Sequence, residues 1–91
     1  MASVFLTFRI MPESPDISLA SLQQQISDAI TTFGGRVVKT ENQPVAFGLI
    51  ALQLIFALDE SKGSTDALEQ TIEHIAGVQS VDVVDVRRVV G

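Results

Sequence analysis

The amino-acid sequence predicts an α+β fold, with four antiparallel strands in one sheet and two helices on one face of that sheet. Apolar residues alternate with a period of two in the segments expected to be strands, and they recur every three or four residues in the two expected helices. Glycine or proline separates most of these segments. The chain has 91 residues, which suits one apolar core, so we expect a single domain over residues 1–91.

The first strand and the first helix are expected within residues 4–33. Residues 4–11 alternate, and Pro12 ends the strand because proline cannot donate a hydrogen bond to a neighbouring strand. Ser18 is suited to cap the helix that follows. One helical face carries the apolar residues Leu19, Leu22, Ile26, Ala29, Ile30 and Phe33. Gly34 and Gly35 are expected to end this helix.

The second and third strands are expected on either side of an apolar loop. Residues 36–41 are predicted to form the second strand, and residues 44–49 the loop. Residues 50–58 are almost continuously apolar, so we expect this third strand to run through the centre of the sheet. Its core face is predicted to carry Ile50, Leu52, Leu54, Phe56 and Leu58.

The last helix and strand are expected in residues 64–86. Ser64 can cap the helix, and Gly77 is expected to close it. The inward stripe is predicted to be Leu68, Ile72, Ile75 and Ala76. Residues 78–86 are predicted to form the last strand, with residues 87–91 as a short tail. Asp82 and Asp85 are three positions apart, so we expect them on opposite faces of that strand.

The order of elements determines the topology. The chain reads strand, helix, strand, strand, helix, strand, and its two halves resemble each other as an internal pseudo-repeat. Right-handed crossovers place both helices on the same side of the sheet. This arrangement is the ferredoxin-like βαββαβ sandwich, whose other sheet face is left open.

Composition excludes several classes of function. The chain has no cysteine and one histidine, so we expect no metal site, no cofactor and no catalytic chemistry of its own. His74, and the pair Glu13 and Asp16, are interpreted as solvated surface groups. The net charge of −5, with only six scattered Lys and Arg residues, argues against direct nucleic-acid binding. The sequence also lacks a signal peptide and an apolar run of about 18 residues, so we expect a cytoplasmic protein without membrane contact.

Two features are not explained by folding. Phe47 lies in the apolar loop between the small residues Ala46 and Gly48, so it is either exposed or folded back over the end of the core. Arg87 and Arg88 are adjacent and make up two of the six basic residues of an acidic chain. The ordinary interpretation of such a pair is a solvated surface.

Three motifs in order give these features a context. They are Met11-Pro12-Glu13-Ser14-Pro15, Pro44-Val45-Ala46-Phe47-Gly48-Leu49 and Asp85-Val86-Arg87-Arg88. On these motifs the chain resembles the archaeal-type elongation factor 1-beta family of guanine-nucleotide exchange factors, over essentially its whole length. The resemblance implies a protein partner, the GTPase elongation factor 1-alpha, whose bound GDP would be released during translation elongation.

The resemblance also implies roles for individual residues. Phe47, flanked by Pro44, Ala46 and Gly48, would insert into a pocket on the nucleotide domain of the GTPase. A basic residue near the C-terminal end, Arg88 first and Arg87 second, would act at the magnesium and phosphate region. We expect Phe47 and Arg88 to lie near each other and form one wedge. The eukaryotic proteins end in a lysine and one apolar residue, whereas here two arginines precede Val89-Val90-Gly91.

One alternative from another class remains open. A small-molecule-sensing or protein-interaction module can have the same strand order, since this fold hosts many functions. The exchange-factor interpretation expects no small-molecule ligand. An acylphosphatase-like enzyme is excluded, because residues 11–16 lack its arginine phosphate loop and catalytic asparagine.

Overall fold

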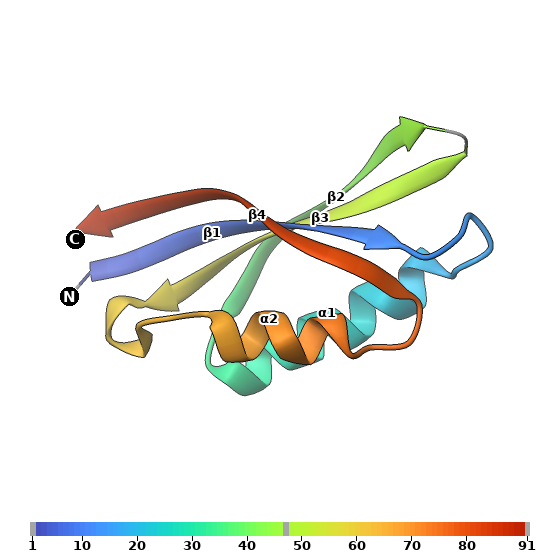
Figure 1. Cartoon of the computed structure of the whole chain (residues 1–91). Coiled ribbons are helices and arrows are strands. Elements are labelled where there is room, and N and C mark those ends of the chain that lie inside the picture. The colour runs from blue at the N-terminus through green and yellow to red at the C-terminus, as the bar shows by residue number, and fades with distance from the viewer. Residues whose placement is uncertain (1, 47, 91) are drawn as a thin grey trace.

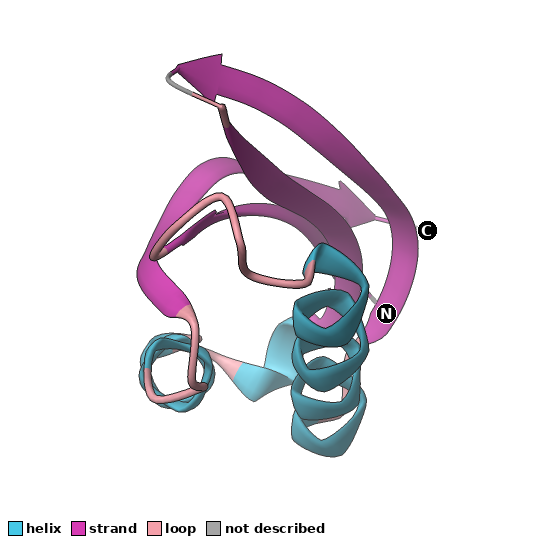
Figure 2. Ribbon diagram, turned by 90° about the vertical axis from the view of Figure 1, so that its right-hand side faces the viewer, coloured by secondary structure: helices cyan, strands magenta, loops and turns pink. Residues whose placement is uncertain are grey.

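The predicted fold is confirmed by a computed structural model, which describes residues 2–46 and 48–90 (Figure 1). The elements are β1 (Ala2–Pro12), α1 (Leu19–Phe33), β2 (Arg36–Ala46), β3 (Leu49–Asp59), the 3-10 helix η1 (Glu60–Lys62), α2 (Asp66–Glu73) and β4 (Val78–Val90). The four strands form one antiparallel sheet in the order β2-β3-β1-β4. Both helices lie on the same face of the curved sheet, and no described element covers the other face (Figure 2).

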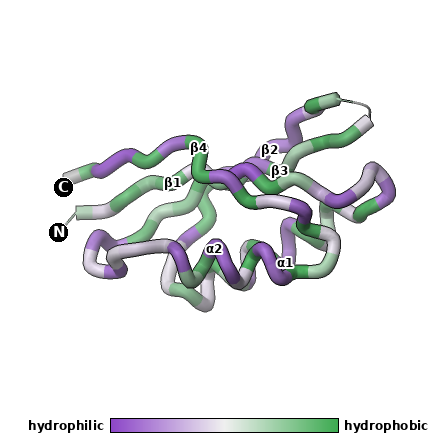
Figure 3. The backbone as a smooth tube through the Cα atoms, in the orientation of Figure 1, coloured by the Kyte–Doolittle hydropathy of each residue, from purple (hydrophilic) through white to green (hydrophobic). Residues whose placement is uncertain are grey.

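The core lies between the two helices and the inner faces of β1 and β3. Phe8 and Phe56 are fully buried at its centre, with ring centroids 4.8 Å apart and an interplanar angle of 87°. This edge-to-face arrangement is favourable for aromatic pairs. The helices contribute Leu22, Ile26, Ile30, Leu68 and Ile72. Apolar residues follow the central strands, whereas polar and apolar residues alternate along both helices (Figure 3).

The sequence predicted the N-cap of α1 correctly, but the N-cap of α2 is Thr65, which makes no side-chain capping bond, and Ser64 lies one residue before it. The Ser18 Oγ accepts a hydrogen bond from the backbone N–H of Ser21 at 3.2 Å. The Ser64 Oγ accepts from the N–H of Asp66 at 3.1 Å. Helix α2 ends at Glu73. It is therefore shorter than predicted, since the expected inward stripe extended to Ala76. Ile75 still packs against the core from the following turn, but Ala76 is exposed, so its assignment to the inward stripe was wrong.

The edge strands β2 and β4 are longer than predicted. The expected apolar loop is largely strand, because β2 continues to Ala46 and β3 begins at Leu49. Pro44 is tolerated because β2 is an edge strand, where a missing N–H can face solvent. The expected C-terminal tail is also wrong, because β4 continues to Val90 and pairs Arg87 with Phe5 and Arg88 with Val4.

An irregularity in β4 changes which faces its aspartates occupy. Asp82 pairs with Arg9 and Asp85 pairs with Thr7, so one extra residue of β4 is inserted between these pairs. Thr7 and Arg9 are two positions apart and share the open face of the sheet. Asp82 and Asp85 therefore lie on that same face, and their predicted placement on opposite faces was wrong because a β-bulge cannot be read from spacing alone.

The proline-rich turn after β1 is tied to the start of β4. The N–H of Glu13 donates to the carbonyl oxygen of Gly77 at 2.9 Å, and the N–H of Gly77 donates to the Glu13 Oε1 at 3.1 Å. Gly77 has a φ of 96°, and a Cβ there would lie 3.1 Å from the Ile17 side chain. Glu13 is exposed, as expected, but its hydrogen bonds also join the turn after β1 to the start of β4.

Candidate functional site

The β2–β3 hairpin ends in an exposed apolar tip. Phe47 itself lies outside the described residues. Its neighbours Pro44, Ala46 and Gly48 are all exposed, as is Val45, of which 42% is accessible. Gly48 adopts a φ of 78°, which favours glycine, and a Cβ there would meet nothing within 4 Å. The described residues on both sides of Phe47 are therefore not folded back over the core.

The hairpin tip lies beside the turn that follows β1. A small hollow of about 50 Å³ is lined by Gly48 and Ile50 on one side. The other side consists of Pro12, Ser14, Pro15, Ile17 and Leu19. Two of the three sequence motifs therefore meet at this end of the molecule, which we call the hairpin end.

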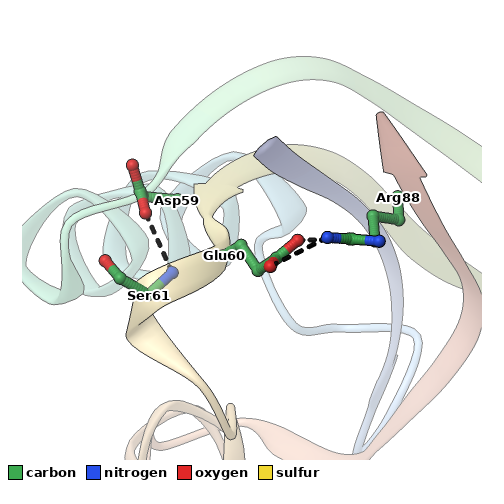
Figure 4. A network of polar contacts seen from close by, with 4 residues as sticks. All are labelled: Asp59, Glu60, Ser61 and Arg88. Atoms are coloured by element: carbon green, nitrogen blue, oxygen red, sulfur yellow. Dashed lines mark hydrogen bonds and ion pairs between the residues drawn. The ribbon is translucent and has the colours of Figure 1, made fainter. Parts of the chain in front are cut away.

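Arg88 lies at the far end of β4, on the helix side of the sheet, where it meets Glu60 of η1. The Arg88 Nη2 donates to the Glu60 Oε1 at 3.0 Å, and the Arg88 Nε donates to the Glu60 Oε2 (Figure 4). The two side chains remain 63% and 44% exposed. We call this region the arginine end.

Glu60 was missed by the sequence analysis, which singled out no residue between the third strand and the second helix. It is 28 positions from Arg88 in the sequence, and no motif connects the two residues. The turn is ordered by local bonds, because the Asp59 Oδ1 accepts from the N–H of Ser61 at 2.9 Å (Figure 4). The backbone N–H of Gly63 donates to the carbonyl oxygen of Glu60 at 3.2 Å.

Hydrogen bonds stabilise the charged forms of the ionisable groups at the arginine end. The hydrogen bond from Arg88 holds the pKa of Glu60 below its ordinary value, while Glu60 raises the pKa of Arg88. The hydrogen bond from the Ser61 N–H likewise lowers the pKa of Asp59. Both carboxylates and the guanidinium are therefore charged at neutral pH.

Arg87 points to the opposite side of the sheet from Arg88. Its Nε lies 2.9 Å from the Asp85 Oδ2, and 78% of its side chain is exposed. Arg87 and Asp85 line a shallow hollow of about 420 Å³ on the open face. Phe5, Thr7, Ile55 and Val89 form the rest of its lining. Because successive residues of a strand face opposite sides, the two arginines present their charges to different surfaces.

The hairpin end and the arginine end are far apart. Ala46 pairs with Leu49 at one end of β3, whereas Arg88 is joined through Val4 to Leu58 at the other end. At about 3.4 Å per residue, Leu49 and Leu58 are separated by roughly 30 Å. The longest dimension of the molecule is 42 Å, and the two ends lie on opposite sides of Figure 1.

The expectation of one wedge was therefore wrong, because the described residues on either side of Phe47 lie at the hairpin end, far from Arg88. Residues 87–91 were expected to form a short tail after the last strand. Antiparallel pairing with β1 instead carries β4 away from the hairpin and fixes Arg88 beside the first residues of the chain.

Other kinds of site find no support in the described part of the chain. No cluster of three or more His, Asp or Glu side chains that could hold a metal ion occurs among the described residues. His74 is exposed, with its Nδ1 2.6 Å from the Gln70 carbonyl oxygen at the end of α2. Within residues 2–46 and 48–90, no helix is both long enough and apolar enough to cross a membrane.

Comparison with known proteins decides the family. Residues 5–89 match the family described as the EF-1 guanine nucleotide exchange domain. The chain belongs to this family. It is 39% identical to elongation factor 1-beta of Methanothermobacter thermautotrophicus over 88 residues, covering 97% of this chain and 98% of that protein. It is 41% identical to elongation factor 1-beta of Methanobrevibacter smithii over 88 residues, with the same coverage. The resemblance expected from the three motifs is confirmed.

Solved structures support the fold of this exchange-domain family member. The ACT domain of GTP pyrophosphokinase from Chlorobium tepidum superimposes with a TM-score of 0.62, covering 90% of this chain and 99% of that domain. The sequences are only 18% identical, so this similarity concerns the fold alone.

Proposed function

We propose that residues 1–91 act as one exchange domain that promotes GDP release and GTP loading on the GTPase elongation factor 1-alpha during translation elongation. The observation that carries this proposal is the match of residues 5–89 to the exchange-domain family. The relatives named elongation factor 1-beta support it. The proposal places the protein in the cytoplasm and requires no chemistry, metal, cofactor, nucleic acid or small-molecule ligand of its own.

The thermodynamic basis of the activity is linkage. An exchange factor must bind the nucleotide-free GTPase more tightly than the GDP-loaded GTPase. The ratio of these two affinities equals the factor by which the exchange factor weakens GDP binding. The surfaces that contact the GTPase therefore determine the activity, and no covalent step is needed.

Two separate contacts fit this chain better than one wedge. We assign the first to the hairpin end, where Phe47 would anchor the partner and Pro44, Ala46 and Gly48 would surround the anchor. Because the two ends are roughly 30 Å apart along β3, we place the Phe47 contact on a part of the GTPase well away from its magnesium ion. The paired strands between the ends would act as a rigid spacer.

We assign the second contact to the arginine end. A guanidinium that approaches the magnesium and phosphate region would compete with the cation and with the groups that hold it. Arg88 is our first choice for this role and Arg87 the second. Their opposite orientations make the choice testable, because each presents its charge to a different face of the sheet.

The direct test is release of labelled GDP from elongation factor 1-alpha. We expect Phe47→Ala to lower kcat/KM about 10- to 100-fold, as for a buried aromatic anchor at an interface. Arg88→Ala should lower it by a similar or smaller factor, and Arg87→Ala less than Arg88→Ala. Arg36→Ala, which removes an exposed arginine from β2, is the matched control and should act like wild type.

Two results would refute parts of the proposal. Full activity in both Phe47→Ala and Arg88→Ala would remove the residue assignments while leaving the function. No stimulation of GDP release by the wild-type protein would remove the function. The alternative of a small-molecule sensor would instead require a ligand-dependent rise in Tm.

A further inference from the structure

The guanidinium of Arg88 is engaged from one side only. Its Nε–H and one N–H of Nη2 bond to the two carboxylate oxygens of Glu60. An arginine side chain carries five N–H donors in a planar fork, so three remain, two on Nη1 and one on Nη2. Among the described residues, Glu60 alone accepts hydrogen bonds from Arg88. The outer edge of the fork is therefore available for a second anion.

The contact is anchored through the backbone on both sides. Arg88 belongs to β4 and pairs with Val4 of β1. Glu60 belongs to η1, which is closed by the Asp59–Ser61 and Glu60–Gly63 hydrogen bonds. A bidentate arginine–carboxylate pair between two ordered elements fixes both the position and the plane of the guanidinium.

We propose that Glu60 is a positioning residue, which holds the Arg88 guanidinium so that its free Nη1–Nη2 edge faces an anionic carboxylate or phosphate group of the bound GTPase. This inference rests on the proposed exchange function. A long, exposed side chain normally loses conformational freedom when it binds. Glu60 removes that loss from the binding step, because the side chain is ordered before the partner arrives.

Two other ion pairs occur among the described residues, and both differ from the Glu60–Arg88 pair. Lys39 pairs with Glu41 at 2.8 Å, and Arg87 pairs with Asp85 at 2.9 Å. Each joins residues two positions apart on one strand. The Glu60–Arg88 pair instead connects η1 to β4 across 28 positions. Glu41→Gln removes an equally exposed carboxylate from a pair that has no proposed role.

The test is a double-mutant cycle on GDP release from elongation factor 1-alpha. Glu60→Gln keeps the size of the side chain but removes its charge, and we expect kcat/KM to fall on the order of 3- to 10-fold, mostly through KM. In an Arg88→Ala background, Glu60→Gln should have no further effect, because its role acts through Arg88. Glu41→Gln should match wild type. NMR relaxation of the Arg88 Nε–H should show a side chain with restricted motion in wild type. The same signal should show a freely moving side chain in Glu60→Gln.

The outcomes separate this inference from the function on which it rests. If wild type releases GDP and Glu60→Gln is equally active or more active, Glu60 does not position Arg88. The same conclusion follows if the losses from Glu60→Gln and Arg88→Ala simply multiply. If wild type fails to release GDP, the proposed function is overturned, and the role of Glu60 in it falls as well.

Discussion

The hairpin end and the arginine end of this small sheet differ in nearly every physical property. The hairpin end is apolar, and its described side chains Pro44, Val45 and Ala46 are exposed. The arginine end is ionic, and its central residue Arg88 is held by Glu60. Apolar contacts depend on buried area, whereas exposed charge contacts depend on ionic strength. We therefore expect the two proposed contacts to respond to different conditions.

The largest effect on stability is expected from a change at Gly77, which is hydrogen-bonded to the turn beside the hairpin tip. Gly77→Ala would place a Cβ 3.1 Å from Ile17, at a φ of 96°. We expect unfolding free energy to fall by about 1 to 3 kcal/mol, because the backbone strain and the steric conflict act together. Chemical denaturation measures this loss.

Gly48→Ala is the matched comparison. Gly48 also has positive φ, at 78°, but its Cβ would meet nothing within 4 Å. We expect a loss of about 1 kcal/mol from the backbone alone. Equal losses in the two variants would show that the Ile17 side chain moves away from the added methyl group at no cost, so that only the backbone conformation matters.

In the exchange assay, ionic strength should change the contribution of the arginine end more than that of the hairpin end. Raising salt from 0.1 M to 1 M shortens the Debye length from about 10 Å to about 3 Å. We expect the activity difference between wild type and Arg88→Ala to shrink several-fold over this range. The difference between wild type and Phe47→Ala should persist, since an apolar contact is not screened. Equal salt sensitivity of both differences would contradict the assignment of one apolar and one ionic contact.

The smallest effect concerns pH and the Glu60–Arg88 pair. Folding lowers the pKa of Glu60, because Arg88 donates hydrogen bonds to its ionised form. The pair therefore stabilises the protein above the unfolded-state pKa of Glu60, and this contribution is lost as pH falls through the lowered folded-state pKa.

The measurement is the Tm of wild type and of Glu60→Gln between pH 7 and pH 3. Wild type should have the slightly higher Tm at neutral pH, and the difference should vanish in acid. The effect is small because the pair is exposed to solvent. A Tm difference that stays constant down to pH 3 would mean that Glu60 contributes through packing rather than charge.

The sequence predicted the fold well because the fold depends on local periodicity. Alternation in residues 4–11 and the apolar run of residues 50–58 mark the two central strands, whose inner faces are largely buried, although Ile50, predicted on the core face, is exposed. The helical stripes likewise identified the residues that cover them, apart from Ala76. These patterns arise because each segment buries one face. The spacing of apolar residues within a single segment is therefore enough to reveal them.

The edges of the sheet were harder to predict because they depend on pairing. Pro44 suggested a loop, yet an edge strand accepts proline on its solvent side. The bulge in β4 moved Asp82 and Asp85 to one face. Arg87 and Arg88 were assigned to a tail because the pattern of residues 87–91 gives no sign of strand pairing. Their place in β4 depends on the length of β1, with which they pair.

The candidate site was predicted as a set of residues, and the arrangement expected for them, one wedge, was wrong. The motifs indicated Phe47, which lies outside the described residues, and Arg88, whose role stays a prediction. They could not show that the described residues of the hairpin end are separated from Arg88 by the length of β3, nor that Glu60 contacts Arg88. Both facts are long-range consequences of the topology, which spacing in the sequence does not encode.

The central claim is that the two ends contact the GTPase independently. The measurement that tests it is kcat/KM for GDP release with wild type, Phe47→Ala, Arg88→Ala and the double variant. For sites roughly 30 Å apart, we predict that the two losses in transition-state free energy add to within about 0.5 kcal/mol. A double variant no slower than the slower single variant would contradict the claim, because it would mean that Phe47 and Arg88 act as one unit.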